Sequence, residues 1–272
     1  MDKFRKPNSK THFCRIKKFL TEKHPFVFVR FSDGETEILK NHYLEISTEK
    51  VVWSGGISGR GFPAFDQKKF NPKLHQEFRR DLLLSAIYDA PNYFKGVPSS
   101  HNGAEQDRNL MIRLNGGLSS SLTFADLFLN GNFLLYRKKI LPIFDSFCSV
   151  SIIGNYRMVP GLYRNGWNHI KIPDNFFETY GEVKSTVWKQ IENLPVGSLV
   201  LSSASSLSNI LGLQVCISRP DLTFIDIGTT LHDIMGMQSG IRGYHIELEN
   251  WHINNFYKKI KYKMAKEYKL KW

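Results

Sequence analysis

Four short apolar segments, each followed by a turn, constrain the fold of this chain more than any other feature. They are rich in aromatic and β-branched side chains and lie at residues 26–31, 149–153, 198–202 and 222–228. Helices are predicted between and after them, over residues 35–43, 72–89, part of 121–141, 178–192 and 205–213. Such alternation is typical of a parallel sheet with helices on both faces. We therefore predict an α/β, Rossmann-like fold.

The composition narrows the class of protein. The 272 residues are 42% hydrophobic and 23% charged, which excludes a disordered chain. The three cysteines, Cys14, Cys148 and Cys216, are too far apart to suggest a disulfide framework or a zinc site, so a reducing, cytoplasmic setting is expected. No apolar stretch reaches the roughly 18 residues of a membrane span, and the first ten residues do not resemble a signal peptide.

The basic charge is concentrated at the two ends of the chain. Residues 1–24 contain eight basic and two acidic side chains, and residues 251–272 contain seven lysines and one glutamate. Since the total is +12, the body between them is neutral. We expect a basic helical segment at 1–24, one Rossmann-like domain at 25–250 and a basic aromatic tail at 251–272. A nucleic-acid enzyme would spread its basic surface over the body, so no nucleic-acid partner is expected.

The tail after residue 250 interleaves aromatic residues with lysines. This composition suits peripheral contact with an anionic membrane, which would place the protein at the inner face of the membrane. The alternative is a solvated helix whose lysines only keep the protein in solution.

The turn after the first predicted strand carries the first candidate site. Arg30, Asp33 and Glu35 lie in the stretch RFSDGE, where a glycine-containing turn allows both carboxylates to converge on Mn²⁺ or Mg²⁺ and Arg30 to contact a phosphate. The same residues also read as a helix capping box, Ser32-x-x-Glu35, without any metal. A P-loop, GxGxxG, HExxH and GxSxG are all missing from the sequence.

Two further groups follow later strands. Asp226 ends the fourth predicted strand and precedes a Gly turn and the pair His232-Asp233, a pattern that fits a general base or metal ligand as well as ordinary turn capping. The serine-rich turn at 202–206 leads into a helix, where it can hold a phosphate or only cap the helix. The Gly- and Ser-rich stretch 53–61 fits a mobile lid or a plain connection.

Six stretches in order resemble the GT-D type glycosyltransferases, a family with a DxE motif that was once a domain of unknown function. They span roughly residues 25–240 and comprise residues 30–35, 93–98, 130–132, 152–155, 199–204 and 224–228, with Asp233 following the last of them. Ser32 replaces the family's usual glycine, and the turn 202–206 lacks a glycine expected near a phosphate. The resemblance implies a Rossmann-like hexosyltransferase-type enzyme with a nucleotide-sugar donor and a glycan acceptor.

The resemblance also implies roles for individual residues. Mn²⁺ or Mg²⁺ would bind at Asp33 and Glu35. The residues expected to contact the donor are Arg30, Gly154, Asn155, Ser202 and Ser203. Those expected to activate the acceptor hydroxyl are Asp226, Asp233 and His232. A non-catalytic Rossmann-like module that binds a nucleotide or a partner is the main alternative. A methyltransferase is a weaker third option, because the first strand is not followed by the glycine-rich loop that usually approaches the cofactor of such enzymes.

Overall fold

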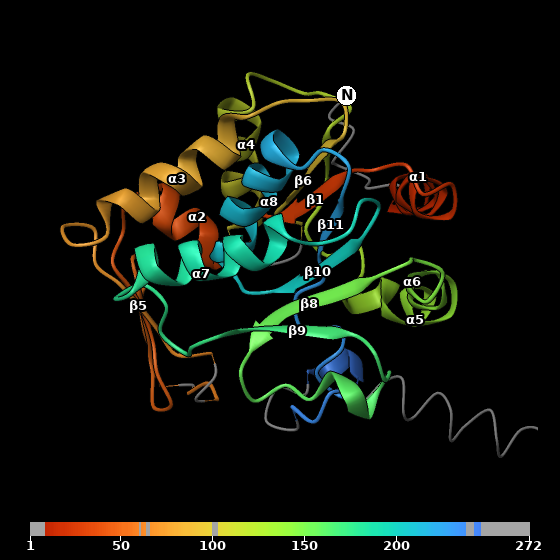
Figure 1. Cartoon of the computed structure of the whole chain (residues 1–272). Helices are drawn as coiled ribbons and strands as arrows, with labels where there is room; N and C mark the ends of the chain where they lie inside the picture. Colours follow the sequence, from red (N-terminus) through yellow and green to blue (C-terminus); the bar gives the residue numbers. More distant parts are fainter. Residues whose placement is uncertain (1–8, 60, 64–65, 100–102, 238–241, 246–272) are drawn as a thin grey trace, which may run out of the picture.

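The centre of the molecule is a seven-stranded parallel sheet. A computed structural model describes residues 9–59, 61–63, 66–99, 103–237 and 242–245 of the chain (Figure 1). The strand order is β7-β6-β1-β11-β10-β8-β9, and every pairing is parallel. The strands are β1 Val27–Arg30, β6 Tyr93–Val97, β7 Leu122–Phe124, β8 Val150–Asn155, β9 Asn168–Ile172, β10 Leu199–Ser203 and β11 Thr223–Asp226. The predicted Rossmann-like α/β class is confirmed.

Helices cover both faces of this sheet (Figure 1). One face packs against α2 Asp33–Leu39, α3 Gln76–Ile87, α4 Ala104–Leu114, α7 Tyr180–Glu192 and α8 Ser206–Ser218. The other packs against α1 Ser9–Thr21, α5 Phe133–Lys139 and α6 Leu141–Phe144. The sheet therefore separates two hydrophobic cores, and alternate side chains of each strand enter one core or the other, as in Val27 and Phe28.

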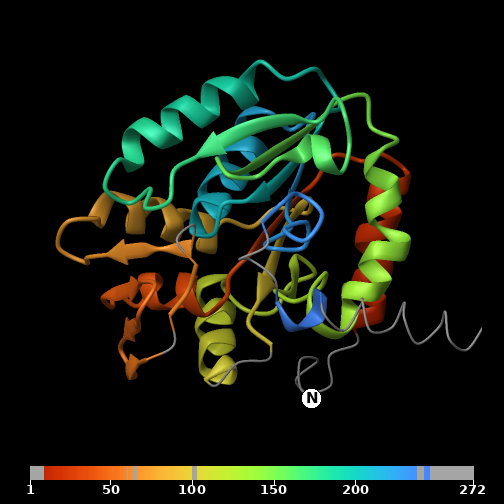
Figure 2. The same cartoon turned by 90° about the horizontal axis from the view of Figure 1, so that it is seen from below.

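A second, smaller sheet lies beside the main one and was not predicted. It is antiparallel with the order β4-β3-β2-β5, and its strands are β2 Leu44–Ile46, β3 Val51–Trp53, β4 Gly56–Ser58 and β5 Lys68–Phe70. Figure 2 shows it beyond the end of α2, on the side away from α1. Its strands have only three residues each, too few for alternation to stand out in a sequence. Residues 53–58 of the Gly- and Ser-rich stretch lie in the β3–β4 hairpin.

Several boundaries differ from the predicted ones. Helix α8 continues to Ser218, whereas α3 is shorter than residues 72–89. The stretch 121–141 contains β7, a short 3₁₀ helix at Asn130–Asn132, where the interruption was predicted, and then α5. Strands β6, β7 and β9 were missed altogether.

Buried Lys95 explains why β6 does not read as a strand. Its ammonium group donates to the carbonyl oxygens of Ala86 (2.9 Å) and Tyr88 (2.5 Å), at the end of α3. Burial lowers its pKa to about 8. A charged residue in a fully buried strand breaks the apolar pattern, while the helix end supplies its acceptors.

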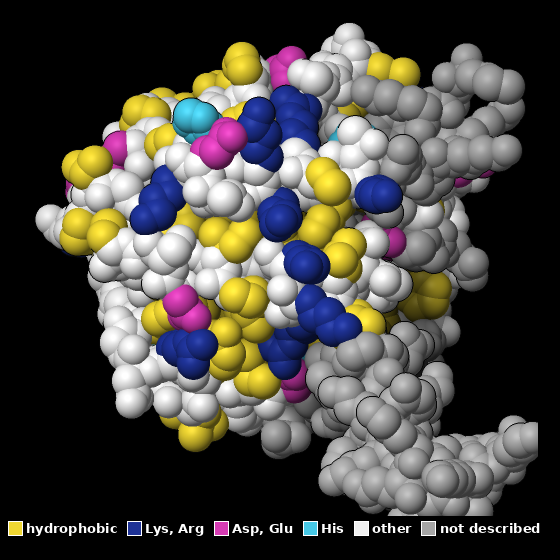
Figure 3. Space-filling model, turned by 90° about the vertical axis from the view of Figure 1, so that its right-hand side faces the viewer, with side chains coloured by type: hydrophobic (Ala, Val, Ile, Leu, Met, Phe, Trp, Pro, Cys, Tyr) yellow, Lys and Arg dark blue, Asp and Glu magenta, His cyan; other side chains and the backbone are white. Residues whose placement is uncertain are grey.

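The helical face formed by α1, α5 and α6 is the most basic part of the described surface that Figure 3 shows. Neither α1 nor α5 contains an acidic residue, and together they contain seven basic ones. Residues 1–8 and the predicted tail at 251–272 lie outside the described residues. Within the described part of the chain, no helix combines the length and the apolar character needed to cross a membrane.

Candidate active site

The DxE turn joins β1 to α2. Ser32 is the N-cap of α2, and its backbone N–H donates to Glu35 Oε2 at 3.0 Å, the glutamate half of a capping box. Asp33 is exposed, and its Oδ1 accepts a hydrogen bond from the Gly34 N–H at 3.0 Å. The capping-box interpretation is therefore confirmed, and both carboxylates also line a cavity, while metal binding by them stays a prediction.

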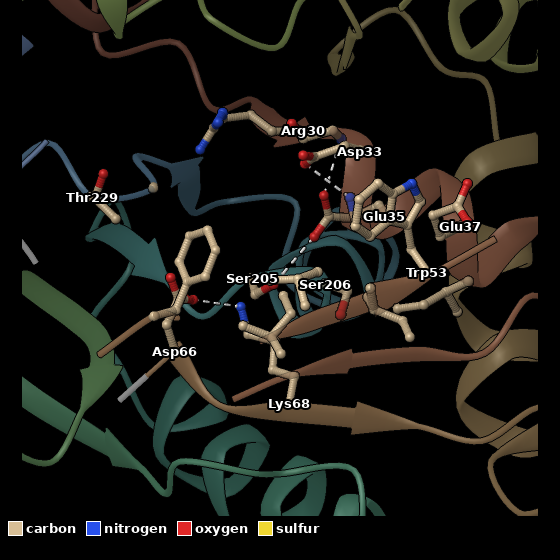
Figure 4. A pocket seen from close by; sticks show the side chains of 18 of the residues that line it. Arg30, Asp33, Glu35, Glu37, Trp53, Asp66, Lys68, Ser205, Ser206 and Thr229 are labelled. Atoms are coloured by element: carbon tan, nitrogen blue, oxygen red, sulfur yellow. Dashed lines mark hydrogen bonds and ion pairs between the residues drawn. The ribbon is translucent and has the colours of Figure 1, made fainter. Parts of the chain in front are cut away.

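The cavity lies at the carboxyl ends of the parallel strands, where ligands bind in this fold class. The last residues of β1, β9, β10 and β11 line it, together with Asn155 of β8, while the small sheet forms part of the opposite wall. Its volume is about 1120 Å³. Since pockets for one small ligand span roughly 300–1,000 Å³, this cavity has room for two substrates. Figure 4 shows its polar side chains.

Glu35 is the most constrained acid of the site. Its side chain is buried, and Ser205 Oγ donates to Oε1 at 3.2 Å. Burial raises its pKa, although the nearby charges of Lys68 and Arg30 oppose the rise. Figure 4 shows the carboxylates of Asp33 and Glu35 next to each other. A buried carboxylate with a second one beside it favours the arrival of a cation.

Asp226 and Arg30 face each other across the ends of β11 and β1. The Arg30 Nη1–Asp226 Oδ1 distance is 3.7 Å, and Arg30 Nε donates to the Ala125 carbonyl oxygen at 2.5 Å. Burial raises the pKa of Asp226 to about 6, although Arg30 lowers it in part. Gly228 has φ +53°, and a Cβ at this position would collide with the Arg30 guanidinium. This explains the glycine after the strand.

The other two predicted catalytic residues are separated. His232 lines the cavity, is buried, and has Nε2 3.0 Å from Ser203 Oγ. Asp233 does not line it, and its Oδ2 accepts a hydrogen bond from Arg137 Nη2 of α5 at 2.6 Å. The structure therefore brings Asp226 and His232 to the cavity but not Asp233.

Of the residues predicted to contact the nucleotide-sugar donor, some line the cavity and others do not. Asn155 and Ser203 line the cavity, and Asn155 Nδ2 donates to Asp174 Oδ1 at 2.7 Å. Ser202 is buried with its Oγ 2.8 Å from Ser208 Oγ, and Gly154 is buried where a Cβ would collide with the Met158 sulfur. Ser202 and Gly154 do not line the cavity.

Several cavity residues were missed, among them Glu37, Trp53, Asp66, Lys68 and Arg242. Asp66 Oδ1 lies 2.9 Å from Lys68 Nζ and its Oδ2 lies 2.7 Å from Arg242 Nη2. Burial raises the pKa of Asp66, but these two cations outweigh it and lower it to about 2. The only sequence signal is the i, i+2 spacing of Asp66 and Lys68, which is too common to identify a site.

Glu37 ties the hairpin to the DxE helix. It lies one turn after Asp33 on α2, and its Oε2 accepts from Ser54 N at 3.2 Å and from Ser54 Oγ at 2.5 Å. Trp53, the neighbour of Ser54, is 36% exposed and lines the cavity. The small sheet is thereby attached to the helix that carries the carboxylate pair.

The burial of His232 should make the stability of the fold sensitive to acid pH. Burial lowers its pKa from 6.5 to about 3, so the native state requires the neutral ring, and stability is lost as pH falls from 6.5 towards 3. Between pH 7 and pH 4, we expect wild type to lose about 3 kcal/mol more unfolding free energy than His232→Gln. Urea unfolding at both pH values measures this, and equal losses would show that His232 is not held neutral.

The carboxylates of the cavity suit a divalent cation that a phosphorylated ligand helps to hold. Among the described residues, no group of three or more His, Cys, Asp or Glu side chains could hold a metal ion. Mg²⁺ and Mn²⁺ at phosphate-transfer sites commonly take only one or two carboxylates, with water and substrate phosphates completing the shell. The pair Asp33 and Glu35 fits this mode, in which the cation would be held jointly with a phosphorylated ligand.

Comparisons with known proteins agree on the fold. No family model and no curated protein matches the chain. One solved structure, described as the highly conserved domain of unknown function 1792 with a distinct glycosyltransferase fold, matches with a TM-score of 0.52 and 13% identity over 80% of this chain and 77% of that chain. Another, a new glycosyltransferase (DUF1792) from Streptococcus sanguinis, matches with a TM-score of 0.53 and 14% identity over 84% of each chain. The chain has this glycosyltransferase fold, as the DxE resemblance predicted.

Proposed function

We propose that the protein is a metal-dependent glycosyltransferase that moves a sugar from a nucleotide-diphosphate sugar, with UDP as the expected nucleotide, to a glycan acceptor. The expected setting is the biosynthesis of surface polysaccharides or glycoconjugates. The observation that carries the proposal is that Asp33, Glu35 and Asp226 face one cavity large enough for two substrates, at the strand ends where this fold binds ligands. The solved structures of the same fold described as glycosyltransferases support it.

The residues divide the chemistry between them. When bound, Mn²⁺ or Mg²⁺ would neutralise the diphosphate leaving group. Asp33 and Glu35 would hold it, and Arg30, fixed by Ala125 and Asp226, would add positive charge. Asp226 is the candidate general base for the acceptor hydroxyl, because a pKa of about 6 leaves it ionised at pH 7 and close to the optimum for proton transfer.

His232 remains the competing candidate base. Its pKa of about 3 keeps the ring neutral, and its Nε2 lies against Ser203 Oγ. A base with so low a pKa accepts a proton poorly, which favours Asp226 for this role. Asp233 is predicted only to position Arg137, because it lies outside the cavity.

Release of the free nucleotide (UDP, GDP or CMP) from a panel of UDP-, GDP- and CMP-linked sugars tests the proposed activity. We expect release from one donor class, in the presence of Mn²⁺ or Mg²⁺ and not with EDTA. Metal-independent nucleotide binding without any turnover would instead favour a non-catalytic Rossmann-like module.

The basic face of α1, α5 and α6 supports a second part of the proposal, an acceptor that is lipid-linked or held at an anionic membrane. Lys10, Lys18, Lys138 and Lys139 are exposed on these helices, and the exposed apolar Leu135 lies one turn before Lys138 and Lys139 on α5. Clustered lysines with apolar side chains among them are attracted to anionic lipid headgroups. The face thus adds to the predicted contribution of the C-terminal tail.

Charge reversal on this face should release the protein from anionic vesicles. We expect Lys10→Glu/Lys18→Glu/Lys139→Glu to lower cosedimentation with phosphatidylserine vesicles at least tenfold, because each nearby lysine contributes about 1 kcal/mol. Lys69→Glu/Lys73→Glu/Lys189→Glu changes the charge equally at exposed positions elsewhere and is the control. Equal losses in both triple variants would assign the effect to net charge alone, and no loss in either would remove this face from membrane binding.

A further inference from the structure

The N-terminus of α8 opens onto the cavity. Residues 203–206, which connect β10 to this 13-residue helix, all line the cavity wall. No acidic side chain lies in the first turn of the helix. The first N–H groups of a helix have no intrahelical acceptor, and with the helix dipole they attract anions.

Ser206, the first residue of α8, provides an independent sign of a ligand. Its side chain is 1% exposed, and its Oγ has no hydrogen-bond partner among the described residues. Buried hydroxyl groups in native proteins nearly always have a partner, because an unpaired one loses its hydration without compensation. Because Ser206 also lines the cavity, a ligand bound there can supply the acceptor that its hydroxyl lacks. Figure 4 shows Ser206 beside Ser205, which is hydrogen-bonded to Glu35.

The surrounding charges indicate what kind of acceptor this is. Arg30 and Lys68 lie close enough to Glu35 to affect its ionisation, and both line the same cavity. Glu35 itself contacts Ser205, so the start of α8 meets the candidate cation site directly. An anion held here would be shared between the helix N-terminus and a cation on Asp33 and Glu35. A diphosphate chelating a divalent cation has this chemistry.

We propose that the N-terminus of α8 and the Ser206 hydroxyl bind a phosphate group of the donor's diphosphate. The identity of the ligand rests on the proposed function, whereas the phosphate site rests on the geometry of α8 and Ser206. Ser206 Oγ–H donates to a phosphate oxygen, and the Glu35–Ser205 hydrogen bond keeps the start of the helix beside the cation ligands.

Calorimetric titration of inorganic pyrophosphate in the presence of Mn²⁺ tests this site without any sugar nucleotide. We expect Ser206→Ala to weaken pyrophosphate binding roughly tenfold, the usual loss for one hydrogen bond to a charged group, and Ser206→Asp to abolish it by charge repulsion. Ser218→Asp, at the exposed far end of the same helix, should bind like wild type. Titration of Mn²⁺ alone should give the same affinity in wild type and Ser206→Ala.

Stability of the ligand-free protein gives a second readout with the opposite sign. Because the Ser206 hydroxyl is unpaired, we expect Ser206→Ala to keep or raise the melting temperature while it weakens pyrophosphate binding. A lower melting temperature with unchanged pyrophosphate affinity would overturn the proposal and make Ser206 a structural residue. Sugar-nucleotide turnover with Ser206-independent pyrophosphate binding would also overturn it and leave the proposed function standing. Pyrophosphate binding that depends on Ser206, without turnover of any sugar nucleotide, would support the phosphate site and contradict the proposed activity.

Discussion

Asp33→Asn is expected to lower metal-dependent release of nucleoside diphosphate at least about 100-fold, an effect of the size seen when a charge-stabilising group is removed from an active site. Asp33 is exposed, and its Oδ1 bond to the Gly34 N–H can be kept by the asparagine oxygen. The melting temperature should therefore stay within a few degrees of wild type. Steady-state rates over a range of Mn²⁺ concentrations measure the effect, and part of the lost activity should return at high Mn²⁺.

Glu77→Gln is the matched control for this substitution. Glu77 lies on α3, its side chain is 65% exposed, and its ion pair with Arg80 is 3.7 Å long. The same removal of one exposed carboxylate should leave turnover unchanged. Full activity in Asp33→Asn, or equal losses in both variants, would contradict the metal-holding role of Asp33.

Asp226→Asn is expected to abolish transfer and to stabilise the fold at neutral pH. Burial raises the pKa of this carboxyl from 3.8 to about 6, so the native state binds a proton more tightly than the unfolded chain. Stability is therefore lost as pH rises from 3.8 through 6, by roughly 3 kcal/mol in total. Asparagine has no charge to bury, and its oxygen can still accept from the Gly228 N–H.

The gain in stability of Asp226→Asn should depend on pH, whereas a gain from improved packing would not. Since Arg30 loses its partner, we expect a net gain of about 1–2 kcal/mol in unfolding free energy at pH 8 and none at pH 4. Urea unfolding of both proteins at the two pH values measures it. A gain that is equal at both pH values would contradict the buried, ionised carboxylate, and retained transfer activity would reassign the base to His232.

The main sheet could be predicted from the sequence because its central strands are continuous apolar runs. Segments 26–31, 149–153, 198–202 and 222–228 correspond to β1, β8, β10 and β11, which are four consecutive strands of the sheet, in the order β1-β11-β10-β8. The missed strands do not have this pattern. Strand β9 reads NHIKI and lies at the sheet edge with alternating exposure, and β6 contains Lys95. A sequence pattern cannot show that the end of α3 satisfies that lysine.

Part of the candidate site could also be predicted from the sequence, and part could not. Asp33, Glu35 and Asp226 could be predicted because each lies at or just after the end of a strand that the sequence reveals, and such strand ends meet at one edge of the sheet. Asp66, Lys68 and Arg242 could not, because they come from a short strand and from a segment near the C-terminus. Asp233 stands next to His232 in sequence, but the turn directs the two side chains to different places.

A thermal-shift panel of UDP, GDP, CMP and their sugar nucleotides, with and without Mn²⁺, tests the donor site most directly. Wild type and Asp33→Asn/Glu35→Gln should be compared, since a ligand that binds the native state raises its melting temperature. The proposed function predicts stabilisation by one nucleotide that requires Mn²⁺ and disappears in the double variant. Stabilisation that is unaffected by metal and by both substitutions, or none with any nucleotide, would contradict it and leave the likeness to the solved glycosyltransferases as one of fold alone.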